Sequence, residues 1–164
     1  MVCLFTKLKN KIAIRGSKLN HDDFHLVVNA WIINDKNEFL ITQRVATKSH
    51  PLMWECTGGS ALINETPIDA AIREINEELG IKVEKDTGIL VGTTRRYYKN
   101  CPDILSVWLF KSNVSIEDLK IQSEEVKDVM WASREKIINL FNEGKFEANS
   151  LFDKIINYCV CPNI

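Results

Sequence analysis

The sequence contains few of the residues that interrupt regular structure, with only 7 glycines and 4 prolines among 164 residues. It also lacks an excess of charge of either sign, because 21 Lys and Arg residues stand against 22 Asp and Glu residues and leave a net charge of −1. The first scarcity excludes a disordered, collagen-like or repetitive chain. The second argues against a basic nucleic-acid-binding protein. A chain of this length that is 45% hydrophobic is expected to form a single domain, residues 1–164, whose core needs no disulfide or structural metal.

Long apolar runs are absent as well. The longest, 26–28 and 30–33, are separated by Asn29, whereas a membrane-spanning helix needs about 20 apolar residues. The apolar run near the N-terminus is too short for a secretory signal, and five cysteines, an odd number, favour reduced thiols. We therefore expect a cytoplasmic protein with no membrane partner. Cys159 and Cys161 lack a second Cys or His pair at zinc spacing, which favours ordinary thiols there.

Apolar patterning predicts strands that flank a central helix, followed by further helices. Strands are expected at 24–34, 39–44, 52–57, 89–98, 104–110 and 126–131, with weaker strand character at 12–14. The first two form a hairpin, and the third should stop at Gly58 and Gly59, because glycine weakens a strand. A short helix begins at Ser115, and two helices within 133–164 have Ser133 and Ser150 as N-caps. Residues 1–23 are expected to form an N-terminal extension, and the order of elements predicts an α/β sandwich.

The clearest helix is predicted between Thr66 and Gly80. Thr66 can cap it, Pro67 suits the first helical position, and Gly80 suits the position just past the end. A buried stripe follows the helical spacing and comprises Ile68, Ala71, Ile72, Ile75 and Leu79.

Three carboxylates, on Glu74, Glu77 and Glu78, are expected to project from one side of this helix, opposite the stripe. Like charges at this spacing repel one another and raise one another's pKa values, and a hard divalent cation such as Mg²⁺ or Mn²⁺ removes the conflict. A solvated acidic face explains the three glutamates equally well. Gly58 and Gly59 shift the balance towards a metal site, because bare backbone can approach a phosphate or offer a carbonyl to a metal.

The segment from Gly59 to Ile81 matches a known pattern at every position. Gly59 is followed after five residues by Glu65, and after seven more by Arg-Glu-Ile-Asn-Glu-Glu-Leu-Gly-Ile at 73–81. This resembles the Nudix box, Gly-x5-Glu-x7-Arg-Glu-U-x-Glu-Glu-x-Gly-U, where U is aliphatic. The resemblance implies an α/β/α sandwich with a mixed central sheet and the box helix packed on it. It also implies Mg²⁺-dependent hydrolysis, with Mn²⁺ as a second option, of a nucleoside diphosphate linked to another group.

The resemblance further implies roles for single residues. The metal ligands would be the Gly58 carbonyl and the carboxylates of Glu74, Glu77 and Glu78. Arg73 would orient the glutamates through ion pairs, and Gly59 and Glu65 would support the site. Related enzymes often place an acidic general base just before the strand expected at 126–131. Glu125 fits that place better than Glu124, with a box glutamate as the alternative.

Substrate specificity must come from residues outside the box, and the substrate itself stays unassigned. Cationic candidates for the phosphates are Arg44, Arg95, Arg96 and Lys99. Candidates for stacking on a base are Trp31, Tyr97 and Trp108, each of which is equally explained by core packing or a solvated strand end. His25 is a further candidate, with a structural role in its strand as the alternative. Residues 59–81 carry five acids and one base, and residues 82–111 carry six bases and three acids, so the two segments could serve the metal and the phosphates.

Two other functions are open within the same family resemblance. Residues 25–34 and 51–54 also resemble type I isopentenyl-diphosphate isomerases, which place a cysteine and a histidine on either side of the glycine that opens the box. Here those neighbours are Gly58 and Ser60, and Cys56 lies out of register. The other alternative is a binding module without activity, but such modules typically lose box glutamates, and all are present. The expected partner is a small nucleoside-diphosphate compound, and a homodimer stays open.

Overall fold

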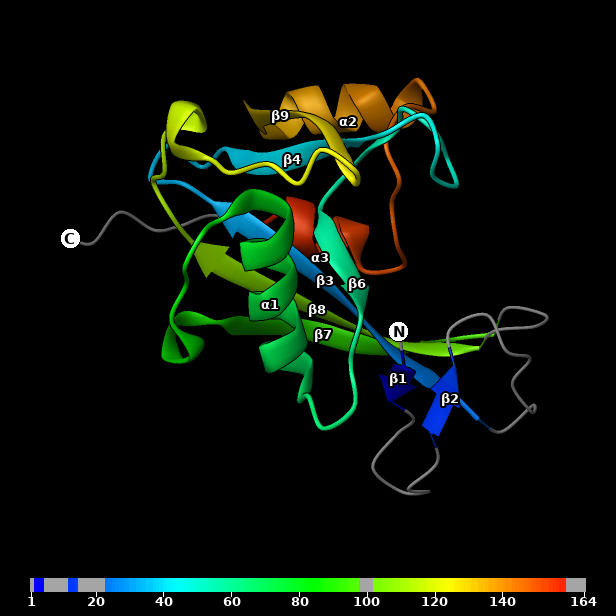
Figure 1. The fold of residues 1–164 in the computed structure, drawn as a ribbon. Coiled ribbons are helices and arrows are strands. Elements are labelled where there is room, and N and C mark those ends of the chain that lie inside the picture. The colour runs from blue at the N-terminus through cyan, green and yellow to red at the C-terminus, as the bar shows by residue number, and fades with distance from the viewer. Residues whose placement is uncertain (1, 5–11, 15–22, 98–101, 159–164) are drawn as a thin grey trace.

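The computed structural model describes residues 2–4, 12–14, 23–97 and 102–158, and these form a sheet with helices on both faces (Figure 1). The sheet has seven strands with the order β5-β4-β3-β8-β7, while β6 pairs with β3 and β9 pairs with β4. Their bounds are β3 His25–Ile33, β4 Phe39–Arg44, β5 Trp54–Glu55, β6 Thr57–Ser60, β7 Ile89–Arg96, β8 Asp103–Lys111 and β9 Val126–Ala132. A separate antiparallel pair joins β1 Val2–Leu4 to β2 Ile12–Ile14. The expected strand positions are thus confirmed within a few residues, apart from β1, which was not predicted.

Strand β3 is the centre of the sheet and makes it mixed. It pairs in parallel with β8 from His25 to Ile33, and antiparallel with β6 from Val27 to Ala30. The predicted hairpin with β4 is present but short, since the two strands pair only at Ile32 and Ile33 before they diverge. The space opened by this divergence is filled by β6, and that arrangement brings the glycine pair beside β3.

The expectation that a strand stops at Gly58 and Gly59 is wrong. Both residues lie inside β6, where Gly58 pairs with Asn29 and Gly59 pairs with Val28. A side chain at either position would collide with its surroundings, because a Cβ on Gly58 would lie 2.3 Å from the Val28 carbonyl oxygen. Glycine is used here for close approach of the backbone.

Helix α1, Pro67–Leu79, begins and ends where the sequence predicts. Thr66 accepts a hydrogen bond from the Asp69 amide, the Asp69 side chain accepts one from the Thr66 amide, and Pro67 occupies the first turn. Gly80 ends the helix with a φ of 70°, in the left-handed region that favours glycine. The helix buries Ala70, Ala71, Ile75 and Leu79 against one face of the sheet.

The opposite face is covered by α2, Arg134–Asn142, and α3, Phe152–Ile156. Ser133 caps α2 as predicted, by accepting from the Lys136 amide. The cap expected from Ser150 is wrong, because Leu151 is the N-cap residue of α3 and makes no side-chain cap bond. The Asn149 side chain accepts from the Leu151 amide instead. The short helix predicted at Ser115 is a single 3-10 turn, Ile116–Asp118, and a second such turn spans Lys85–Thr87.

None of the helices among the described residues is long and apolar enough to span a bilayer.

Candidate metal and diphosphate site

Arg73 joins the predicted supporting and metal-binding residues into one network. Its Nε donates to Glu65 Oε1 at 2.7 Å, and its Nη1 donates to Glu74 Oε1 at 2.9 Å and to Glu77 Oε2 at 2.8 Å. Its Nη2 reaches the Ser60 carbonyl at 3.0 Å, which ties α1 to the end of β6. Glu65 is held in place by the Leu62 amide as well as by the arginine. One guanidinium therefore sets the positions of three box carboxylates relative to the glycine-containing strand.

Glu74 lies directly against Gly59. A Cβ built on Gly59 would come within 2.2 Å of Glu74 Oε1, so only glycine leaves this carboxylate its position. The side chain of Glu74 is only 13% exposed. Burial raises its pKa, and the Arg73 guanidinium offsets part of that effect. The glycine-rich strand and the box helix thus enclose one carboxylate between them.

Glu78 is the most buried of the box glutamates, with 5% of its surface exposed. Burial, and then the charge of Glu74, raise its pKa to about 8. This differs from the expectation that all three carboxylates project opposite the apolar stripe, since Glu78 is buried and Glu77 alone of the three is well exposed. Glu78 borders the apolar stripe because it follows buried Ile75 by three positions and Ala71 by seven, and residues at these spacings share a helix face.

A fourth carboxylate, on the sheet, acts electrostatically on Glu78. Glu55 of β5 is paired with Arg44 of β4, whose Nη1 lies 2.7 Å and 2.6 Å from the two carboxylate oxygens. Burial raises the pKa of Glu55, and Arg44 offsets part of the increase. The charge of Glu55 in turn helps to raise the pKa of Glu78, so the two acids lie close enough to interact.

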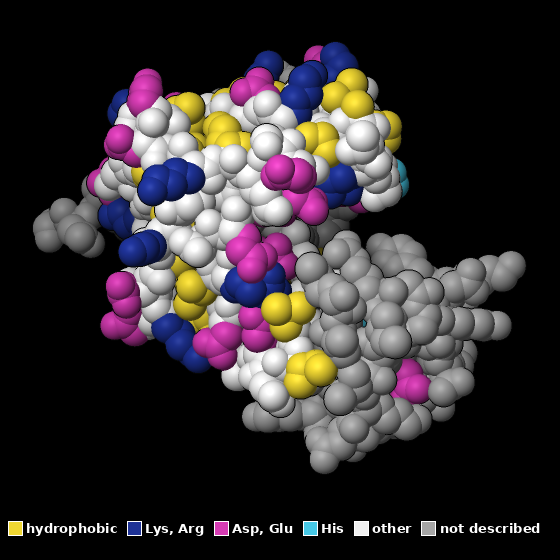
Figure 2. Space-filling model, in the orientation of Figure 1, with side chains coloured by type: hydrophobic (Ala, Val, Ile, Leu, Met, Phe, Trp, Pro, Cys, Tyr) yellow, Lys and Arg dark blue, Asp and Glu magenta, His cyan; other side chains and the backbone are white. Residues whose placement is uncertain are grey.

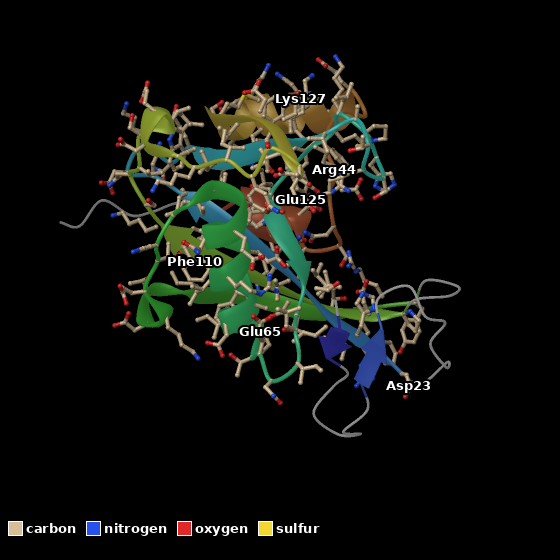
Figure 3. The ribbon with its side chains drawn as sticks, viewed as in Figure 1. Asp23, Arg44, Glu65, Phe110, Glu125 and Lys127 are labelled. Atoms are coloured by element: carbon tan, nitrogen blue, oxygen red, sulfur yellow. The ribbon has the colours of Figure 1, made fainter. Side chains whose placement is uncertain are left out.

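Glu125 reaches the same place from the loop before β9. Its side chain forms an ion pair with Lys48, and its charge also raises the pKa of Glu78. Arg44 and Glu125 lie close together because Arg44 pairs with Val126 across the sheet (Figure 3). Figure 2 shows acidic side chains next to basic ones over α1. A second such group lies over the region of β4 and β9. The sequence pattern missed Glu55 and Lys48. A charged residue in the apolar run 52–57 was the available signal, because buried charges must be paired.

The donor set suits a hard divalent cation. Glu74, Glu78, Glu55 and Glu125 offer only oxygen ligands, and burial raises the pKa values of the first three, so a bound cation would stabilise their ionised forms. Among the described residues, however, no three His, Cys, Asp or Glu side chains lie close enough together to hold a metal ion as they stand. Arg73 forms ion pairs with Glu74 and Glu77, and Lys48 forms one with Glu125.

The cations predicted in 82–111 face other acids. Lys85 pairs with Asp69, Arg96 with Asp103 and Lys111 with Asp35. Arg95 lies over the ring of Phe24, 5.7 Å from its centroid, and exposed Tyr97 packs edge-on against the same ring. Lys85, Arg96 and Lys111 therefore pair with acids other than the box glutamates. Glu74 and Glu77 pair with Arg73 instead, and the charge of Lys48 acts on Glu78.

Several other candidates lie in the core, are engaged in contacts within the fold, or fall outside the described residues. Trp31 is fully buried among Phe39, Phe146 and Phe152 and cannot stack on a base, so that expectation is wrong. Trp108 is half-buried against the core beneath α1. The backbone amide and Nδ1 of His25 both approach the Pro102 carbonyl. Buried Cys56 has a raised pKa, because burial and then the charge of Glu55 disfavour its thiolate. Lys99, Cys159 and Cys161 lie outside the described residues.

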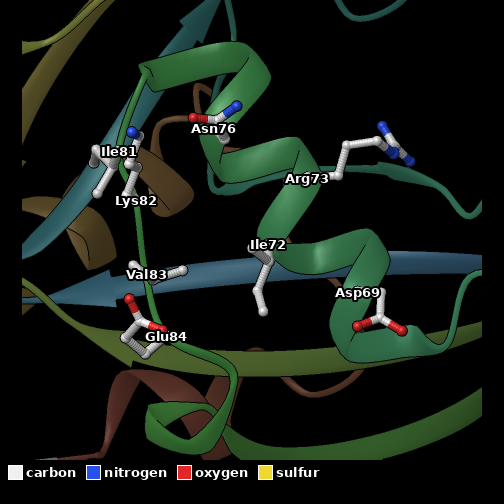
Figure 4. A pocket seen from close by; sticks show the side chains of 8 residues that line it. All are labelled: Asp69, Ile72, Arg73, Asn76, Ile81, Lys82, Val83 and Glu84. Carbon is white, nitrogen blue, oxygen red and sulfur yellow. The ribbon is translucent and has the colours of Figure 1, made fainter.

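A cavity of about 560 Å³ lies on the other side of the box helix (Figure 4). Ile72, Ile81 and Val83 form its apolar part, and Asp69, Asn76, Lys82 and Glu84 are among its polar lining. The side chain of Arg73 points away from the 81–84 segment in this view. The cavity is thus next to the carboxylate site but does not contain Glu74 or Glu78.

Comparison with known proteins was made at the level of sequence and of fold. Residues 23–153 match the family model of the NUDIX domain. The chain is 34% identical over 154 residues to an uncharacterized Nudix hydrolase of Listeria monocytogenes, and the match covers 92% of this chain and 88% of that protein. It is 30% identical over 158 residues to an isopentenyl-diphosphate delta-isomerase of Gibberella zeae, where the match covers 81% of this chain and 60% of that protein.

Two crystal structures share the fold. One is from a protein of Deinococcus radiodurans, with a TM-score of 0.70, 19% identity and 88% of both chains covered. The other is a MutT protein from Methanosarcina mazei Go1, with a TM-score of 0.62, 25% identity, and 80% of this chain and 88% of that chain covered. The expected sandwich with a mixed sheet and a box helix packed on it is confirmed.

Proposed function

Because this chain belongs to the Nudix family, we propose that it hydrolyses a diphosphate bond in a nucleoside diphosphate linked to another group, with Mg²⁺ or Mn²⁺ as cofactor. The observation that carries this proposal is the complete box and its placement. Glu74 lies against Gly59, and Glu78 is buried opposite Glu55. A site with this many carboxylates repels a polyanionic substrate unless a cation binds with it.

The carboxylates of Glu74, Glu77 and Glu78 and the Gly58 carbonyl would hold the metal. A bound divalent ion supplies Lewis acidity and charge neutralisation to the diphosphate oxygens. Arg73 keeps Glu74 and Glu77 oriented through its ion pairs. Glu125, at the edge of the site with its side chain 39% exposed, would accept the proton of the attacking water.

The remainder of the substrate has fewer candidate contacts. Arg95 and Tyr97 are exposed at the end of β7, and we propose that they bind the group attached to the diphosphate. Arg44 and Arg96 are already engaged in ion pairs with carboxylates, so a role in binding phosphate requires them to exchange partners.

A panel of nucleoside-diphosphate compounds, assayed with Mg²⁺ or Mn²⁺, tests the proposal. We expect release of phosphate or a nucleoside monophosphate from at least one compound, and loss of at least about a hundredfold in rate with Glu74→Gln. Glu84→Gln, which removes an exposed carboxylate outside the box, is the matched control and should retain the activity. Inactivity of the wild-type protein across the panel, or full activity of Glu74→Gln, would count against a hydrolase.

Isomerisation of isopentenyl diphosphate is the second candidate, because one relative carries that activity in its name. Two observations argue against an isomerase. Gly58 and Ser60 occupy the positions on either side of Gly59 where the isomerases have a cysteine and a histidine, and Cys56 is buried. Conversion of isopentenyl diphosphate to its allylic isomer would establish the isomerase instead. Nucleotide binding without turnover would indicate a binding module.

A further inference from the structure

Lys48 is oriented differently from its neighbours. It lies in the loop between β4 and β5, where Ala46, Thr47, Ser49, His50 and Leu52 are all exposed to solvent. Its own side chain is only 23% exposed. Because lysine is rarely buried unless it is paired, an inward lysine in an exposed loop points to a specific function of its ammonium group.

The ammonium group faces carboxylates from three parts of the fold. It forms an ion pair with Glu125, which precedes β9. It also acts electrostatically on Glu55 of β5 and Glu78 of α1, since its charge lowers the pKa of both acids against the effect of burial. The Lys48 charge therefore acts on three acids at the proposed metal site, one of which, Glu55, also pairs with Arg44.

The loop is fastened to β4 just after Lys48, at Ser49 and Leu52. Arg44 Nε donates to the Ser49 carbonyl at 2.6 Å, and its Nη2 donates to Ser49 Oγ at 3.1 Å. Further along, Gln43 Nε2 donates to the Leu52 carbonyl at 2.9 Å. These bonds hold the backbone in place, so the long flexible side chain of Lys48 is the part of the loop that is able to move.

We propose that Lys48 is a positioning residue that takes the place of the divalent cation in the metal-free protein, holding Glu125 beside Glu55 and Glu78, and that it competes with the metal for this position. The inference rests on the proposed metal-dependent function. Its physical basis is that an ammonium group and a divalent ion repel each other strongly at short range, so both cannot occupy one cluster of carboxylates. Lys48 must release Glu125 before the metal is fully bound.

Mn²⁺ binding to the metal-stripped protein, measured by calorimetry or by the electron paramagnetic resonance of free Mn²⁺, tests the inference without any substrate. Lys48→Met should bind Mn²⁺ about five- to twentyfold more tightly than wild type, because a repelling charge is gone. Lys127→Met is the matched control: Lys127 is exposed on β9 and lies apart from Glu125 in Figure 3. The Mn²⁺ affinity of Lys127→Met should stay within about twofold of wild type. Lys48→Arg keeps the positive charge, so its Mn²⁺ affinity should also be close to that of wild type.

Thermal melting gives a second measurement. In EDTA, Lys48→Met should melt at a lower temperature than Lys127→Met, because its carboxylates lose their counter-charge. Saturating Mn²⁺ should remove that difference, since the metal then supplies the missing positive charge. A purely structural lysine would lower the melting temperature in both conditions and would leave Mn²⁺ affinity unchanged.

Three results would overturn the inference. Unchanged or weaker Mn²⁺ binding by Lys48→Met, with wild type binding normally, would overturn this inference alone. Unchanged Mn²⁺ binding together with a raised KM would show that Lys48 contacts the substrate instead. A wild-type protein that binds no Mn²⁺ at all would overturn the proposed function and this inference together.

Discussion

At the scale of single residues, the two adjacent glycines of β6 have separate physical reasons for being glycine. The Cβ of any residue at Gly58 would strike backbone, since the Val28 carbonyl oxygen lies 2.3 Å from its position. The Cβ of any residue at Gly59 would instead strike the Glu74 carboxylate, the mobile end of a long side chain. Backbone in a central strand cannot move aside, whereas a glutamate side chain can.

We therefore predict that Gly58→Ala and Gly59→Ala will differ in kind. Gly58→Ala should lower the free energy of unfolding by roughly 1–3 kcal/mol or more, because the β3–β6 pairing must distort. Gly59→Ala should cost less stability but weaken Mn²⁺ binding at least about tenfold, since Glu74 is displaced. Urea denaturation and Mn²⁺ titration of both variants provide the measurements, and equal effects of the two on both quantities would contradict the prediction.

At the scale of elements, α1 is specified at both of its ends by local chemistry. Thr66 and Asp69 satisfy each other's backbone amides at the start, and Gly80 adopts a φ of 70° at the end. A Cβ on Gly80 would also lie 2.7 Å from Lys120 Cβ, so the segment that follows the helix is packed closely against its end. The box glutamates lie between these two fixed ends.

Substitutions at the ends of α1 should lower stability by predictable amounts. Thr66→Ala is expected to reduce the free energy of unfolding by about 1 kcal/mol through loss of the cap. Gly80→Ala is expected to cost about 1–2 kcal/mol, because a left-handed conformation is strained for alanine. Thr66→Ser keeps the cap oxygen and serves as the control. Urea denaturation of the three variants gives the values, and a Thr66→Ser variant as unstable as Thr66→Ala would contradict the capping explanation.

At the scale of the whole molecule, the acids around Glu78 make folding depend on pH. Burial raises the pKa values of Glu55, Glu74 and Glu78, that of Glu78 to about 8. Between the ordinary glutamate pKa and about 8, the folded protein therefore holds a proton at Glu78 that the unfolded chain has released. Under these conditions the folded state binds more protons, so the stability contributed by this group decreases as pH rises through that interval.

The metal-free protein should accordingly lose roughly 2–4 kcal/mol of stability between pH 5 and pH 8. Glu78→Gln should reduce this dependence, because the amide does not ionise, whereas Glu84→Gln, an exposed site, should keep the wild-type slope. Chemical denaturation in EDTA at a series of pH values measures the effect. Stability that rises towards pH 8 in the wild-type protein would show that Glu78 is not held in its protonated form.

The parts that the sequence predicts well are those that depend on neighbours in the chain. The helix at Pro67–Leu79, its caps, the strands at Phe39–Arg44 and Val126–Ala132 and the box all follow from residue spacing within a short stretch. Periodicity and capping act over a few residues, so they can be read without knowledge of the fold. The expectation for Ser150 failed because its neighbour Asn149 accepts from the Leu151 amide, and the strand does not end at Gly58 because this residue pairs with β3.

Only the tertiary structure decides which charges meet. The sequence alone determined the family's box, its helix and the order of the elements, because these reside in local pattern. The sheet register brought Arg44 next to Val126 and buried Trp31 beneath the C-terminal helices. It also placed Lys48 against Glu125, far along the chain. Such contacts arise from strand pairing and packing across long separations. The near-neutral net charge of −1 thus contains a local concentration of buried acids, with its own cations supplied by β4 and the loop that follows it.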